Sequence, residues 1–162
     1  MKLIQRRLLS SIFVLVGVLG YSSISLAASG AFETNVAVDG PAIVDVSNQS
    51  GKVVVRGGDV DEITIRAHIT VDKRTSRTDP IKAGRMIDSI KRSPPVQTDG
   101  NRVVISALEK RSQQRHVSIS YEIIVPRDAA VSVRSVSGDV LVSGVEGHVD
   151  AESESGEVTQ AG

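Results

Sequence analysis

Few residues in this 162-residue chain could act as a nucleophile or a base. Cysteine is absent, and no Gly-x-Ser-x-Gly motif presents a serine as a hydrolase does. The three histidines are His68 and His116, on the polar positions of alternating stretches, and His148, beside a glycine. We interpret each as a solvated surface histidine, and no two have metal-ligand spacing. The sequence therefore predicts a protein without catalytic residues, bound metal or cofactor.

Acidic residues gather in two places. The run Asp59–Glu62 resembles a fragment of a calcium loop, but it lacks the glycine and the distal glutamate of a complete one. Near the C-terminus, Asp150, Glu152 and Glu154 alternate along one stretch. We favour a solvated acidic face that discourages pairing between strand edges, and a weak divalent-cation site is the alternative.

Positive charge is concentrated in the middle of the chain. From Lys73 to Arg115 there are 11 basic and 4 acidic residues, whereas Val131 to Gly162 holds one basic and six acidic residues. Attraction of charge predicts a surface for anionic lipid, lipopolysaccharide or another envelope polymer. A solvated basic face is the simpler alternative. The candidate anion-binding residues are Lys73, Arg74, Arg77, Lys82, Arg85 and Lys91.

The elements that position these residues are short strands in an 18-residue repeat. Val131–Gly144 aligns with Val149–Gly162, and a looser copy occupies Val44–Gly57. Valine alternates with serine and acidic residues, which is typical of strands with one buried face. The predicted fold is all-β, a β-solenoid-like or β-helix-like stack of short strands. Glycines at the corners are expected to take positive φ, and they are Gly51, Gly138, Gly144 and Gly156.

One short helix interrupts the predicted strands. Asp79 is a good N-cap, Pro80 suits the first helical position, and Pro94 and Pro95 end the run. Apolar residues recur inside it at helical spacing, and they are Ala83, Met86, Ile87 and Ile90. Long alternating strands are expected on either side, and residues 73–79 are interpreted as a polar loop.

Residues 1–27 have the pattern of an export signal, with Lys2 and two arginines before an apolar run and small residues at Ser25–Ala27. The run Leu8–Leu19 is too short to span a bilayer. We therefore expect one exported domain over residues 28–162, in the periplasm, on the cell surface or outside the cell. Nucleic acid is a poor partner for it, because the exported part has only two aromatic residues.

Several motifs together resemble a known family. They are Ser50–Val53, the helix, the Asp99–Val103 hairpin, Tyr121–Pro126 running into Val131–Val140, and Ser155–Val158. In this order they resemble the β-strand-repeat "putative adhesin" family of bacterial envelope proteins, a domain of unknown function. The resemblance implies a solenoid-like fold without established catalytic residues. Similar proteins usually continue through more repeats, so we expect either a shortened member or an open C-terminal edge that self-associates.

These observations predict a non-catalytic envelope or surface module, adhesin-like or interaction-based, whose partner is not named by the sequence. One alternative is a β-helix enzyme acting on polysaccharide, and another is an envelope-stress sensing module that binds anionic polymer. The enzyme is disfavoured because the chain lacks an aromatic platform for sugar rings.

Overall fold

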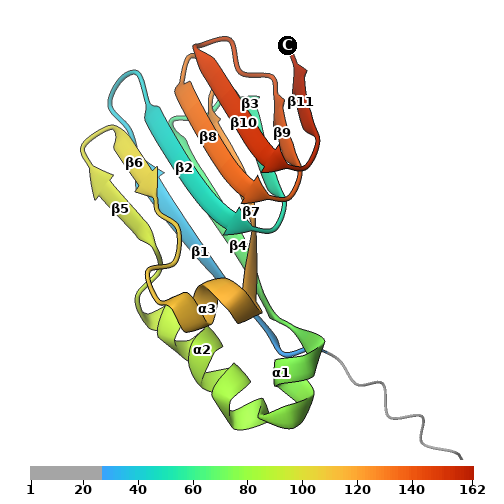
Figure 1. The fold of residues 1–162 in the computed structure, drawn as a ribbon. Helices are drawn as coiled ribbons and strands as arrows, with labels where there is room; N and C mark the ends of the chain where they lie inside the picture. The colour runs from blue at the N-terminus through green and yellow to red at the C-terminus, as the bar shows by residue number, and fades with distance from the viewer. Residues whose placement is uncertain (1–26) are drawn as a thin grey trace, which may run out of the picture.

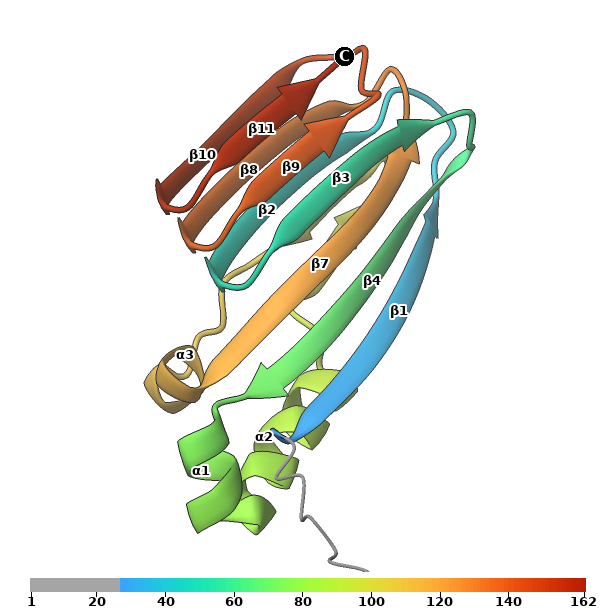
Figure 2. The same ribbon diagram turned by 90° about the vertical axis from the view of Figure 1, so that its right-hand side faces the viewer.

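The computed structural model describes residues 27–162, so the expected export signal lies outside the described residues except for Ala27. Strands predominate and form two mixed sheets (Figures 1 and 2). The first sheet has the order β1 (Ser29–Ala37), β4 (Glu62–Val71), β7 (Val117–Pro126), β3 (Val53–Gly58), β9 (Val140–Ser143) and β11 (Val158–Ala161). The second has the order β10 (Val149–Ser155), β8 (Ala130–Ser137), β2 (Ile43–Ser50), β6 (Arg102–Ile105) and β5 (Val96–Asp99).

The expected predominance of strands is confirmed, but two mixed sheets stand in place of a plain solenoid. Antiparallel β1 and β4 extend the first sheet, and the antiparallel β5–β6 hairpin extends the second. The long strands pair in this way because β4 and β7 each alternate over ten residues, which gives each one continuous buried face. The two sheets enclose a core made chiefly of valine and isoleucine.

Parallel pairing joins the copies of the repeat. Strand β8 lies between β2 and β10, and strand β9 lies between β3 and β11. The register pairs Val131 with Val149 and Val140 with Val158, so the sequence offset of 18 is also the spatial offset. Equivalent valines of successive copies therefore pack on one another, and this explains why the alternation repeats.

The corners of the repeat use glycine for two reasons. Gly138 has a φ of 131°, and a Cβ there would lie within 3.0 Å of the carbonyl oxygen of Gly51. Positive φ occurs at Gly51 and Gly144 as well. Gly156 does not have the left-handed φ that we expected. Glycine suits that position because a Cβ would meet the carbonyl oxygen of Gly138 in the preceding corner.

Three helices lie together at one end of the sheets, where the sequence predicted one (Figure 1). They are α1 (Lys73–Thr78), α2 (Pro80–Arg92) and α3 (Arg111–His116), and we call them the helical end. The rest of the described chain is the β body. The segment expected to be a polar loop is helical because Asp72 caps it, accepting a hydrogen bond from the backbone N of Thr75 at 2.8 Å.

Helix α2 packs against β1 and β4 through the predicted apolar positions. Its buried residues are Ala83, Met86, Ile87 and Ile90. Gly30 on β1 admits the helix, because a Cβ there would collide with the side chain of Ile87. The opposite face of α2 is left to solvent. Within residues 27–162, no helix is long and apolar enough to cross a membrane.

Candidate functional site

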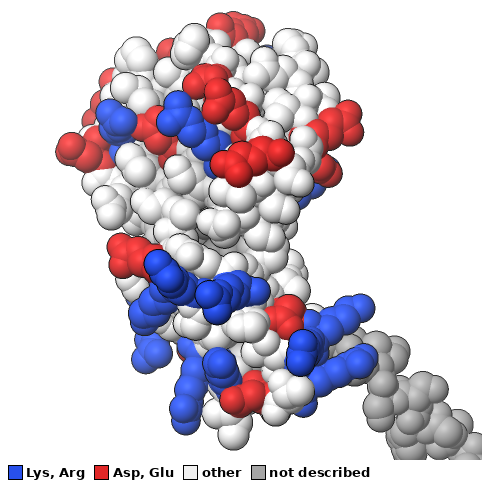
Figure 3. All heavy atoms as spheres, viewed as in Figure 1, with Lys and Arg blue, Asp and Glu red and all other residues white. Residues whose placement is uncertain are grey.

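The helical end carries most of the basic side chains of the middle of the chain. Figure 3 shows Lys and Arg gathered over the helices, while Asp and Glu are frequent on the visible face of the β body. All six predicted anion-binding residues lie on α1 or α2. The structure adds Arg92 at the end of α2 and three residues at α3, namely Lys110, Arg111 and Arg115. The sequence had shown the charge excess but not that α3 would join it.

Ion pairing separates this cluster from the basic residues of the β body. Each β-body arginine contacts a carboxylate: Arg56 pairs with Glu122, Arg66 with Glu33 at 3.1 Å, Arg102 with Asp45 at 2.6 Å, Arg127 with Asp59 at 2.7 Å, and Arg134 with Glu152 at 3.8 Å. By contrast, no side-chain ion pair within residues 27–162 involves the five exposed cations Lys73, Arg74, Lys82, Arg85 and Lys91. Arg77 makes an interaction of its own and is not counted among them. The helical end thus presents charge that the molecule itself does not neutralise.

A polar clamp holds α1 beside α3. Nδ1 of His116 lies 2.9 Å from Oδ2 of Asp72 and 3.1 Å from Oγ1 of Thr75. The backbone N of Asp72 also donates to the carbonyl oxygen of His116 at 2.8 Å. The backbone hydrogen bond from Thr75, assisted by the Thr75 hydroxyl and by His116, lowers the pKa of Asp72 to about 2. The clamp therefore joins the end of β4 to the start of β7 and fixes the helices between them.

The same clamp contains an acid, an imidazole and a hydroxyl, which are the groups of a catalytic triad. In a triad, the acid contacts one ring nitrogen and the hydroxyl contacts the other, so that a proton can pass through the ring. Here both Asp72 and Thr75 contact Nδ1 of His116. This geometry cannot relay a proton from Thr75 to Asp72, and it supports a structural role.

Helix α2 displays its cations opposite its buried face. The side chain of Asp79 accepts a hydrogen bond from the backbone N of Lys82 at 2.9 Å, which fixes the first turn. Lys82 and Arg85 are exposed, as is Arg92 at the last turn. An apolar side chain lies among them: Ile81 is 68% exposed, whereas the other exposed large hydrophobic residues have values between 37% and 42%. Neither periodicity nor charge had drawn attention to Ile81.

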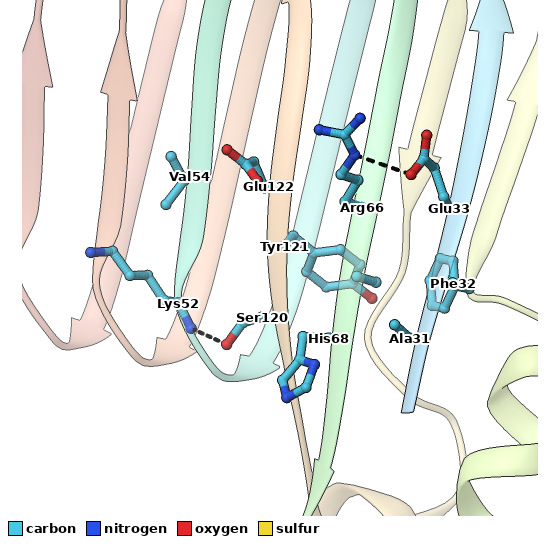
Figure 4. Close-up of a pocket in the computed structure, with 11 residues that line it drawn as sticks. Ala31, Phe32, Glu33, Lys52, Val54, Arg66, His68, Ser120, Tyr121 and Glu122 are labelled. Atoms are coloured by element: carbon cyan, nitrogen blue, oxygen red, sulfur yellow. Dashed lines mark hydrogen bonds and ion pairs between the residues drawn. The ribbon is translucent and has the colours of Figure 1, made fainter. Parts of the chain in front are cut away.

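A second candidate site is an open groove of about 660 Å³ on the outer face of the first sheet (Figure 4). The Glu33–Arg66 ion pair and His68 line it, together with the aliphatic surface of Val54. Ser120 accepts a hydrogen bond from the backbone N of Lys52 at 3.2 Å. His68 has no hydrogen-bond partner among the described residues, so the groove does not pair a base with a nucleophile.

The acidic candidates have structural partners. Asp59 pairs with Arg127, and this contact lowers the pKa of the Asp59 carboxyl. Asp139 accepts a hydrogen bond from the backbone N of its repeat equivalent, Glu157, at 3.2 Å. Across residues 27–162, no three His, Cys, Asp or Glu side chains come together in a way that could hold a metal ion. The acids of the repeat therefore help to join successive turns.

Comparison with known proteins gives no family assignment. No family model matches the chain, and no curated protein matches it. Among solved structures, a "putative cell adhesion protein" from Clostridium sporogenes is similar with a TM-score of 0.48 at 7% identity, over 82% of this chain and 59% of that one. From Parabacteroides distasonis, a "putative adhesin" matches with a TM-score of 0.29 at 8% identity, over 76% of this chain and 46% of that one. A "putative lipid binding protein" from the same organism gives 0.30 at 6%, over 70% and 46%. The chain thus spans about half the length of these structures.

Proposed function

We propose that this chain is an exported, non-catalytic binding module of the cell envelope or surface, and that its helical end binds anionic polymers or lipid headgroups. The observation that carries the proposal is the contrast in ion pairing. Carboxylates neutralise the β-body arginines, whereas Lys73, Arg74, Lys82, Arg85 and Lys91 have no such partners among the described residues. Unpaired cations on one surface attract polyanions without an internal competitor.

The alternatives have less support. A polysaccharide-active enzyme would need carboxylates directed into a groove. The groove on the first sheet contains Glu33 and Glu122, but each contacts an arginine. An envelope-stress sensor that binds anionic polymer would use the same helical end, so it is a biological setting for the proposed binding and not a different surface.

Salt dependence tests the proposal. The exported, processed protein is added to immobilised polyphosphate or lipopolysaccharide while the salt concentration is raised. Because the screening length falls from roughly 30 Å at 0.01 M to roughly 3 Å at 1 M salt, we expect strong binding at the low value and little at the high one. Absence of binding at low salt, or binding insensitive to salt, would refute the proposal.

A second proposal concerns self-association through the C-terminal strands. Strands β10 and β11 are the outermost strands of their sheets, and Val158 is 37% exposed beside this edge. Pairing with strands of a second copy would satisfy the backbone groups of the edge. Asp150, Glu152 and Glu154 on β10 would repel a like edge, so we expect association to strengthen as salt rises. Light scattering that finds only monomers at high concentration, at every salt concentration, would exclude it.

A further inference from the structure

The exposed isoleucine on α2 identifies the class of anion that suits the helical end. We infer that the helical end docks on the surface of an anionic lipid bilayer, with Ile81 inserted between headgroups and the cations around it contacting phosphates. This inference rests on the proposed binding of polyanions. It goes further by choosing a membrane over a soluble polymer and by giving the protein an orientation.

Ile81 lies on the stripe of α2 that points away from the core. Arg85 and Arg92 follow at four and eleven residues, spacings that return to the same side of an α-helix. The buried positions, Ala83 to Ile90, occupy the opposite side. Asp88 shares the outer stripe, so the stripe combines one apolar residue, two cations and one acid. An apolar residue among arginines and lysines on an exposed helix face is the composition of interfacial membrane-binding helices.

The apolar residue is what separates a membrane from a soluble polymer. A phosphate polymer has no apolar phase, so an exposed isoleucine adds nothing to its binding. A bilayer gains from both features, because the isoleucine leaves water and the cations meet the negative surface potential. The other large exposed hydrophobic residues all belong to the β body, and each is less exposed than Ile81.

The start of the described chain lies at the same end. The backbone N of Ala28 donates to Oγ of Ser76 on α1 at 3.0 Å, and the carbonyl oxygen of Ala28 accepts from the backbone N of Val71 at 2.9 Å. Cleavage of the expected export signal after Ala27 would place a new α-amino group beside α1, and so add a positive charge to the docking surface. The acidic strand β10 lies in the β body, so docking through the helices would leave its carboxylates away from the membrane (Figures 1 and 3).

Vesicle binding with matched variants tests the inference. The exported, processed protein is sedimented with vesicles of phosphatidylcholine alone and with vesicles containing 30 parts in 100 (roughly, by mole) of phosphatidylglycerol, a range in which each basic residue contributes measurably. Binding is also measured to soluble polyphosphate. Ile81→Ser is compared with Val60→Ser, a control that removes another exposed aliphatic side chain, 38% exposed, from the β3–β4 turn. Both variants keep every basic residue.

We expect the wild type to bind the anionic vesicles and not the neutral ones. Ile81→Ser should weaken vesicle binding about tenfold, as the loss of one inserted aliphatic side chain implies. It should leave polyphosphate binding unchanged, and Val60→Ser should change neither. Polyphosphate binding without vesicle binding, or equal vesicle binding by Ile81→Ser and wild type, would overturn the inference and leave the proposed function standing. Binding to neither probe would overturn both.

Discussion

The β body and the helical end treat charge and glycine in opposite ways. In the β body, arginines contact carboxylates, and glycines sit where a Cβ would collide with backbone of the neighbouring turn. At the helical end, cations face solvent unpaired, and Gly84 of α2 has open space around it. The β body is therefore constrained by its own contacts. The helical end is held by one polar clamp and one apolar helix face, and its outer surface is available to a partner.

The largest effect should come from a corner glycine. Gly138→Val places a β-branched residue at a φ of 131° and against the carbonyl oxygen of Gly51. We expect a loss of about 3 kcal/mol or more in the free energy of unfolding, measured by denaturant titration. The matched change at the helical end, Gly84→Ala, should instead stabilise the protein by up to about 1 kcal/mol. Similar results for the two variants would remove the distinction between the regions.

Two polar residues at the base of the repeat should differ from each other. Asn48 is buried, and its side-chain nitrogen donates to the carbonyl oxygens of Gly51 and Ile119, each at 3.0 Å. Its repeat equivalent, Ser135, is also buried, but its hydroxyl has no partner among the described residues. Asn48→Ala should therefore cost about 2 kcal/mol, and Ser135→Ala should lie within about 0.5 kcal/mol of the wild type. Equal costs in thermal unfolding would show that the hydrogen bonds of Asn48 do not fasten this corner.

A smaller effect should appear at the clamp in acid. The pKa of Asp72 is about 2 in the folded protein, against an ordinary value of 3.8 for an aspartate in an unfolded chain, so the ionised carboxylate favours folding. That contribution is complete above the unfolded value and is lost as the pH falls towards 2. Asp72→Asn keeps a capping side chain but removes the charge. We expect its stability, followed by circular dichroism from pH 5 to pH 2, to fall less steeply than that of the wild type. Parallel curves would exclude the clamp as an electrostatic support.

Local patterns in the sequence predict much of the β body but little of how the parts combine. Alternation from Ile63 to Val71 predicts a half-buried strand, and the offset between the repeat copies is their register. Helix α1 was missed because its six residues show no apolar periodicity, and its stability comes from Asp72 and from His116, which is 44 residues away. The mixed sheets likewise depend on long-range pairing, which no local pattern records.

The candidate site was predictable in composition and not in geometry. The charge excess of residues 73–115 is visible in the sequence. Whether a given arginine is free to bind a partner depends on contacts distant in the chain, such as Arg66 with Glu33 and Arg127 with Asp59. Exposure of Ile81 could not be read from periodicity either, because an isoleucine in an amphipathic helix is ordinarily assigned to its buried face.

The most direct test of the account compares equal losses of charge in the two regions. Lys82→Gln with Arg85→Gln removes two unpaired cations from the helical end, and Arg66→Gln with Arg134→Gln removes two paired cations from the β body. Binding of each double variant to immobilised polyphosphate is measured at low salt, after circular dichroism establishes that both are folded. We predict at least a tenfold loss for the helical-end variant, since each lost contact is worth on the order of 1 kcal/mol, and a change below about twofold for the β-body variant. Equal losses would mean that binding follows net charge alone, and would contradict the assignment of the site to the helical end.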